Sequence, residues 1–153
     1  MKTILISTAI FLCSLAASSA SAQEVTGSIG NGTARRGVKT RGTVVLSIPA
    51  ELHVNSNKPK SEYAIPTTVR ISGTGLTIGA ITFPRGTNRK FQFSENLINV
   101  YEGTIFFPFT VTVPRNYKAR SITVKAVVRY QACTDQVCYP PKSKTVDITA
   151  TVR

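Results

Sequence analysis

The residues best suited to chemistry are Cys133 and Cys138, which are separated by the four residues Thr-Asp-Gln-Val. Cys133 ends a segment of alternating apolar and polar residues, and Asp and Gln are plausible in a turn. A four-residue hairpin loop would place the two cysteines opposite each other, within the reach that a disulfide requires. A bond between them could be either a structural staple or a redox-active disulfide.

A structural staple is the simpler interpretation of so local a cysteine pair. In the chain-entropy model, however, a disulfide that closes such a short loop stabilises a protein by only about 2 kcal/mol. A domain that buries its own core gains little from that bond. An accessible disulfide in a surface loop is better suited to thiol–disulfide exchange, which depends on access to the sulfur.

Other kinds of site find little support in the sequence. Two cysteines and the single histidine, His53, do not complete a tetrahedral zinc site without Asp or Glu. The sequence has no G-x-S-x-G motif, no paired-carboxylate pattern in a strong context and no glycine loop of the phosphate-binding kind. We therefore expect neither a metal ion nor a cofactor.

The first 22 residues have the features of a secretory signal peptide. Lys2 precedes an apolar-to-small run of 14 residues from Ile4 to Ala17, and Ala20-Ser21-Ala22 resembles a cleavage site. The alternative is an uncleaved anchor, but a transmembrane helix needs roughly 20 residues. We expect cleavage after Ala22, the loss of Cys13 with the leader, and a periplasmic or secreted mature chain with no membrane span, in which disulfides persist.

The length of 153 residues allows one domain. We expect the signal peptide at 1–22, an N-terminal arm or poorly paired first strand at 23–42, and the folded domain at 43–153.

The formal net charge is +12, from 19 Lys and Arg against 7 Asp and Glu. Export and the scattering of basic residues along the strands argue against nucleic-acid binding, so we interpret the charge as a solvated face that could meet anionic envelope surfaces or acidic partners.

Most of the chain alternates apolar and polar residues with a period of two, which is typical of half-buried β-strands. Gly and Pro separate these segments, and no segment repeats apolar residues at helical spacing. The pattern predicts an all-β, antiparallel β-sandwich, with a β-barrel as the alternative architecture. The residues predicted to share the apolar faces are Val44, Leu46, Ile48, Val69, Ile71, Ile105, Phe107, Phe109, Val111, Val113, Ile122, Val124, Ala126, Val128, Val146, Ile148, Ala150 and Val152.

The segment YQACTDQVCYPP at 130–141 resembles the active-site segment in the N-terminal periplasmic domain of the thiol:disulfide interchange protein DsbD. That domain has Tyr-Gln, a small residue, the first cysteine, a short polar loop, the second cysteine, an aromatic residue and two prolines. Weaker similarities follow in ELHVNSNKPKSEYAIPTTV at 51–69, FPRG at 83–86 and KFQFSENLINVYEG at 90–103. Together they extend from about Arg36 to Arg153.

The resemblance implies an immunoglobulin-like sandwich whose cysteine pair relays electrons between protein dithiols. Cys138 matches the cysteine that forms the mixed disulfide with partners, and Cys133 matches the one that resolves it. The partners would be thioredoxin-like periplasmic proteins, as electron donor and acceptor. DsbD continues into a transmembrane carrier and a thioredoxin-like domain, whereas this sequence stops at Arg153, so the donor would be a separate protein unless this is a piece of a longer chain.

Five further residues are candidates for supporting roles near the cysteines. In the family a cap loop shields the pair, and the nearest match here is Tyr101-Glu102-Gly103. Glu102 could exchange a proton, and His53, where the enterobacterial form has a tyrosine, could tune the thiolate. Tyr130 and Tyr139 flank the cysteines and could screen the disulfide. Each also has a purely structural interpretation, as a surface or sandwich side chain.

The leading hypothesis is an exported thiol–disulfide exchange domain, a protein-disulfide reductase that relays electrons through one cysteine pair. The alternative is a non-catalytic, immunoglobulin-like binding module with a structural disulfide. A third possibility is an adhesion or chaperone-like sandwich that binds peptides at a free strand edge.

Overall fold

The computed structural model describes residues 23–153, so the predicted signal peptide and Cys13 lie outside the described residues. Within the described range every regular element is a β-strand, and none is a helix that could span a membrane. The twelve strands are β1 (Glu24–Ile29), β2 (Thr33–Ala34), β3 (Lys39–Ser47), β4 (His53–Asn55), β5 (Thr68–Ser72), β6 (Thr77–Ile78), β7 (Thr87–Arg89), β8 (Ile98–Tyr101), β9 (Thr104–Thr112), β10 (Ser121–Tyr130), β11 (Ala132–Cys133) and β12 (Lys142–Val152).

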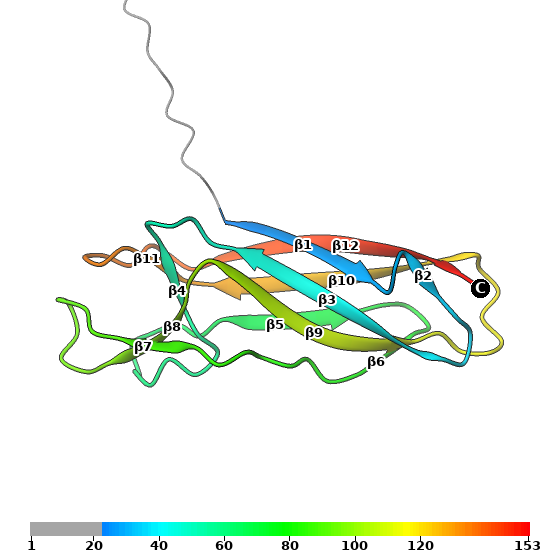
Figure 1. Ribbon diagram of the computed structural model, residues 1–153, viewed down its shortest axis with the longest axis horizontal. Helices are drawn as coiled ribbons and strands as arrows, with labels where there is room; N and C mark the ends of the chain where they lie inside the picture. The colour runs from blue at the N-terminus through cyan, green and yellow to red at the C-terminus, as the bar shows by residue number, and fades with distance from the viewer. Residues whose placement is uncertain (1–22) are drawn as a thin grey trace, which may run out of the picture.

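Two four-stranded sheets form the body of the molecule, with strand orders β1-β3-β9-β6 and β2-β12-β10-β5. Long antiparallel ladders hold each sheet together, β3 with β9 in the first and β10 with β12 in the second. The short pair of β2 with β12 is parallel. The long strands run along the long axis of an elongated molecule (Figure 1). The predicted all-β, antiparallel sandwich is confirmed.

The core lies between these sheets and is built from the alternating residues of the long strands. Because successive side chains of a strand point to opposite faces, every second residue reaches the core. The predicted apolar faces are buried, except that Ile71, Ile105 and Val146 are only partly covered at the edge of the core. The fully buried side chains include Val44, Leu46, Phe107, Phe109, Val111, Ile122, Val124, Ala126 and Val128.

The segment at 23–42, expected as an arm or a poorly paired first strand, contains β1, β2 and the start of β3. β1 pairs with β3 at all six of its positions, from Glu24–Ser47 to Ile29–Gly42. Gly27 makes this packing possible, because a Cβ there would lie 2.3 Å from Ile148 Cδ1 of the other sheet. β1 thus closes one side of the sandwich against β12.

A third sheet, of short strands, lies at one end of the sandwich with the order β11-β4-β8-β7. Figure 1 shows these strands together at the end opposite the C-terminus. Cys133 in β11 pairs with His53 in β4, and β4 in turn pairs with β8 at Val54–Tyr101. This sheet brings segments from four separate parts of the chain to the cysteine pair.

Candidate functional site

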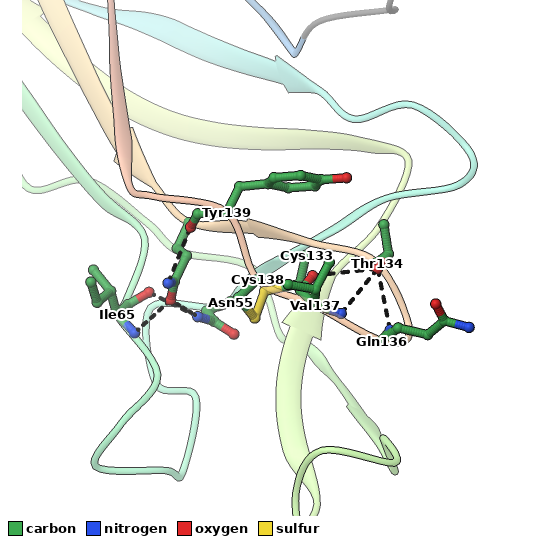
Figure 2. Close-up of a disulfide and its surroundings, with 9 residues drawn as sticks. Asn55, Ile65, Cys133, Thr134, Gln136, Val137, Cys138 and Tyr139 are labelled. Atoms are coloured by element: carbon green, nitrogen blue, oxygen red, sulfur yellow. Dashed lines mark hydrogen bonds between the residues drawn. A yellow bond between two sulfur atoms is a disulfide. The ribbon is translucent and has the colours of Figure 1, made fainter.

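Cys133 and Cys138 form a disulfide at the base of a tight hairpin that extends from the third sheet. Their Cα atoms are 4.0 Å apart, and the two residues form an isolated antiparallel bridge. The Thr134 N–H donates to the Val137 carbonyl at 2.8 Å. The Thr134 hydroxyl oxygen accepts from the N–H groups of Gln136 and Val137, at 3.2 and 3.1 Å (Figure 2). The four-residue loop is therefore held by its own first residue.

The two cysteines differ in their access to solvent. Cys133 is completely buried, whereas Cys138 is only partly covered and contributes to the wall of a surface cleft. Exchange begins with attack of a thiolate on one of the two sulfurs, and access helps to decide which. The fold therefore presents Cys138 to an incoming thiolate and shields Cys133.

Gln131 connects the cysteine hairpin to the loop that precedes β5. Its Oε1 accepts from Asn55 Nδ2 at 3.0 Å and from the Ile65 N–H at 3.2 Å, and its Nε2 donates to the Tyr139 carbonyl at 3.3 Å (Figure 2). Gln131 was part of the family-like segment but was not predicted as a site residue. Its position directly before Ala132 and Cys133 was the available signal.

A cleft of about 640 Å³ opens beside Cys138. One wall comes from residues 60–64, before β5, and the other from residues 93–96, between β7 and β8. Lys60 in the first wall has a φ of 64°, a left-handed conformation that is uncommon for a non-glycine residue. Asn55, Ile98 and Gln131 complete the lining. The sequence did not predict this cleft, because its walls are irregular loops that meet only in the folded chain.

His53 lies in β4 directly across from Cys133 and is 3% exposed. Its ring stacks on Phe91 with the centroids 4.2 Å apart, and Phe91 stacks in turn on Phe93 at 5.2 Å. Burial lowers the pKa of the imidazole from 6.5, against the opposing effect of the carboxylates of Glu102 and Asp135. His53 is thus a buried, neutral neighbour of the cysteine pair at neutral pH.

Arg89, at the end of β7, joins the third sheet to the cysteine loop through two carboxylates. Its Nη1 lies 2.5 Å from Glu102 Oε1, and its Nη2 lies 3.8 Å from Asp135 Oδ1 in the four-residue loop. The guanidinium also lies over the Phe91 ring, 5.7 Å from the centroid. Glu102 therefore reaches the cysteine loop through Arg89, a residue that the sequence did not single out.

The three predicted tyrosines occupy different places, and two of them face the interior. Tyr101 is buried beside Phe107, and its hydroxyl donates to Asn57 Oδ1 at 2.6 Å; burial raises its pKa. Tyr130 is buried at the end of β10, its hydroxyl donates to Gln23 Oε1 at 3.3 Å, and burial raises its pKa too. Tyr139 is 44% exposed, and its ring extends away from the disulfide (Figure 2).

The cover expected at Tyr101-Glu102-Gly103 is not at the cleft. Those residues end β8 and turn into β9, and Tyr101 is part of the main core. The segment that faces Cys138 across the cleft is instead the loop at 93–96, whose Phe93 is 43% exposed. The expected cover was assigned from sequence similarity alone. Which loop lies over a site depends on the strands that the loop connects, and the sequence did not reveal those strands.

Among residues 23–153, no three His, Cys, Asp or Glu side chains gather in a way that could hold a metal ion.

Comparison with known families decides to which group this chain belongs. The family described as "Thiol:disulfide interchange protein DsbD, N-terminal" matches residues 33–150, which is most of the sequence. The chain belongs to this family. Its membership agrees with the immunoglobulin-like sandwich that the resemblance implied, and a DsbD N-terminal domain with a disulfide between Cys133 and Cys138 fits thiol–disulfide exchange in general.

Solved structures that this chain matches include the reduced DsbD N-terminal domain of Neisseria meningitidis. It is 19% identical, with a TM-score of 0.46, over 72% of this chain and 80% of that one. The N-terminal periplasmic domain of ScsB from Proteus mirabilis is 9% identical, with a TM-score of 0.49, over 82% of this chain and 44% of that one. A family 123 glycoside hydrolase from Clostridium perfringens is 12% identical, with a TM-score of 0.39, over 85% and 27%. No curated protein matches the sequence.

Proposed function

We propose that this chain is an exported thiol–disulfide exchange domain that takes two electrons from one protein dithiol and passes them to another protein's disulfide. The observation that carries the proposal is the unequal exposure of the two cysteines. Cys138 contributes to the wall of an open cleft, and Cys133 lies completely buried behind it. A disulfide that served only as a staple would need neither the cleft nor the difference in access.

The reaction would proceed in two exchanges. A donor thiolate attacks Sγ of Cys138, the Cys133–Cys138 bond breaks, and Cys133 leaves as a thiolate. The donor's second thiolate then attacks its own sulfur in the mixed disulfide, which leaves the donor oxidised and this domain reduced. In the second exchange, the Cys138 thiolate attacks an acceptor disulfide. Cys133 then attacks Sγ of Cys138, which releases the reduced acceptor and restores the internal bond.

Thioredoxin-like proteins of the periplasm are the partners that we propose for both exchanges. Exposed apolar side chains belong to residues that line the cleft, Tyr63 and Phe93, or to chain neighbours of lining residues, and such side chains suit docking of a folded protein. They are Tyr63, Phe93, Leu97, Val137 and Tyr139. Support for export comes from the leader-like first 22 residues and from family membership.

Single cysteine variants test the assigned roles. Cys138→Ser should abolish disulfide exchange with a thioredoxin-like donor. Cys133→Ser should accumulate a mixed disulfide through Cys138, because no internal thiol remains to resolve it. Non-reducing gels and mass spectrometry would identify the trapped bond. Full exchange activity in Cys138→Ser would refute the proposal.

The redox potential separates exchange from the alternative of a structural disulfide. Equilibration of the purified domain with graded ratios of reduced and oxidised glutathione, followed by thiol trapping, gives the Cys133–Cys138 potential. A value within roughly −120 to −270 mV, the range of known exchange proteins, is expected. A value below about −300 mV would identify the bond as a staple in a non-catalytic binding module.

A further inference from the structure

The acidic residues of the described chain lie towards one end of the molecule, whereas basic residues occur along its whole length (Figure 1). Of the seven acidic residues of the sequence, six lie in segments near the disulfide end of the sandwich. They are Glu24, Glu51, Glu62, Glu95, Glu102 and Asp135. The seventh, Asp147, lies in mid-strand and pairs with Lys125 at 3.0 Å. No acidic residue occurs in the segments 33–43, 108–123 and 148–153, which meet at the opposite end.

That opposite end carries seven exposed basic residues, which we call the basic pole. They are Arg35, Lys39, Arg41, Arg115, Lys118, Arg120 and Arg153. Within residues 23–153, none of the seven forms an ion pair; the three recorded pairs belong to Arg89 and Lys125. Cations that face no carboxylate of their own protein keep their charge available for an external anion.

Specific contacts hold the three segments of the basic pole together. The Arg36 N–H donates to the Arg153 carbonyl at 2.9 Å, and the Gly37 N–H donates to the Val113 carbonyl at 2.7 Å. The half-buried Arg36 side chain donates from Nε to the Tyr117 carbonyl at 2.8 Å. The Val152 N–H donates to the Arg120 carbonyl at 2.7 Å. The pole is therefore a fixed arrangement of charge and not a set of unrelated surface residues.

We propose that the basic pole binds the surface of a bilayer that contains anionic phospholipids. It lies at the end of an elongated sandwich, over the turns between strands, where β2, the β9–β10 connection and the C-terminal strand meet (Figure 1). Side chains in turns at the end of a sandwich can contact a flat surface together. Each Lys or Arg close to an anionic bilayer increases the affinity for that bilayer about fivefold.

One apolar side chain favours a lipid surface over a purely polar polyanion. Val38 is 50% exposed in the turn between β2 and β3, directly beside Lys39. Apolar side chains next to cations are typical of protein surfaces that lie at the headgroup region, where each group finds its preferred environment. At the basic pole the charged residues close to Val38 in the chain are all cations, whereas the exposed Tyr63 and Phe93 at the cleft lie close to Glu62 and Glu95.

Binding through the basic pole would orient the domain. Because the cysteine pair lies at the opposite end, adsorption would direct Cys138 and its cleft away from the bilayer, towards partners in solution (Figure 1). Only this consequence rests on the proposed function; the binding itself does not require redox activity.

Vesicle co-sedimentation tests the proposal with two variants of equal net charge. Arg35→Glu/Lys39→Glu/Lys118→Glu reverses three charges of the basic pole. Arg129→Glu/Lys142→Glu/Lys144→Glu reverses one arginine and two lysines that are also exposed but lie on β10 and β12, outside the pole. Vesicles of phosphatidylcholine, alone or mixed equally with phosphatidylglycerol, distinguish charge from general adhesion.

We expect the unmodified domain to bind the mixed vesicles and not phosphatidylcholine alone. The pole variant should bind at least about 10-fold more weakly, whereas the control variant should change less than about threefold. Val38→Trp supplies a probe, because the chain has no tryptophan of its own, and its fluorescence should shift to the blue only with the mixed vesicles.

Equal losses in the two variants would show a bulk charge effect and overturn the proposal. So would an absence of binding at physiological salt, or an unshifted Val38→Trp spectrum. Tighter binding to duplex DNA than to the mixed vesicles, lost in the pole variant, would assign the pole to a phosphate polymer instead. Disulfide exchange, measured without vesicles, should be unchanged in the pole variant, whose substitutions lie at the end opposite the cysteine pair (Figure 1), so failure of this proposal and failure of the exchange activity are distinguishable.

Discussion

At the scale of single residues, the surroundings of the disulfide are apolar on one side and open on the other. His53 in β4 is the strand-pairing partner of Cys133 in β11. The His53 ring begins an aromatic stack that continues through Phe91 to Phe93. Cross-strand partners project to the same face of a sheet, so this stack lies beside the buried cysteine. The open side belongs to Cys138 and its cleft. A buried cysteine with an accessible partner directs an incoming thiolate to one sulfur, that of Cys138, and keeps Cys133 for the internal resolving step.

His53 should make the stability of the domain depend on pH. Burial lowers the pKa of His53 below 6.5 in the folded state, so the unfolded chain binds more protons between the two pKa values. The free energy of unfolding therefore falls as the pH drops from about 6.5 through the lowered pKa, and rises again on return to neutral pH. Urea unfolding between about pH 7.5 and pH 5 should show this decline. His53→Phe, which preserves stacking on Phe91, should remove His53's part of it; an unchanged slope would contradict the assignment.

At the scale of elements, the long strands could be predicted from the sequence and the short strands could not. β3, β9, β10 and β12 have nine to eleven residues and repeat the apolar pattern several times. β4, β7, β8 and β11 have two to four residues, too few to establish a period, and long-range pairing holds them in the third sheet. The cysteine hairpin was predictable because its ends are close in sequence. The cleft was not, since its walls are distant in sequence and irregular.

Arg89 should raise the redox potential of the cysteine pair by stabilising the reduced form. It links β7 to Glu102 and to Asp135 in the cysteine loop, so its loss leaves two carboxylates uncompensated near the thiolates. We expect Arg89→Gln to shift the potential towards more negative values by about 4–20 mV, because partly exposed ion pairs are worth about 0.2–1 kcal/mol. Arg89→Lys keeps the charge and should shift less. The effect should shrink at high salt; a shift of opposite sign would contradict this role.

At the scale of the whole molecule, folding gathers basic residues that are far apart in the sequence at an end that has no acidic side chain (Figure 1). The sequence suggested a scattered, solvated basic face, because Arg35, Arg115 and Arg153 are far apart in the chain. Strand connections return all three to one end, through contacts such as those of Arg36 with the Tyr117 and Arg153 carbonyls. The acidic segments gather at the other end, with the disulfide. Sequence position alone could not reveal this polarity, since it depends on which turns share an end of the sandwich.

The sandwich, and not the disulfide, should hold the domain together. The main core lies between the two large sheets, and the cysteine hairpin extends from a separate sheet at one end. Reduction should therefore lower the free energy of unfolding by only about 2 kcal/mol, the chain-entropy contribution of a loop this short, and leave the domain folded. Truncation of the buried Phe109 to Ala should cost more, about 3–5 kcal/mol. Urea unfolding with and without dithiothreitol measures both. Unfolding of the domain on reduction would contradict this prediction. The disulfide would then be required for the fold, and the cysteine pair could not alternate between oxidation states during exchange.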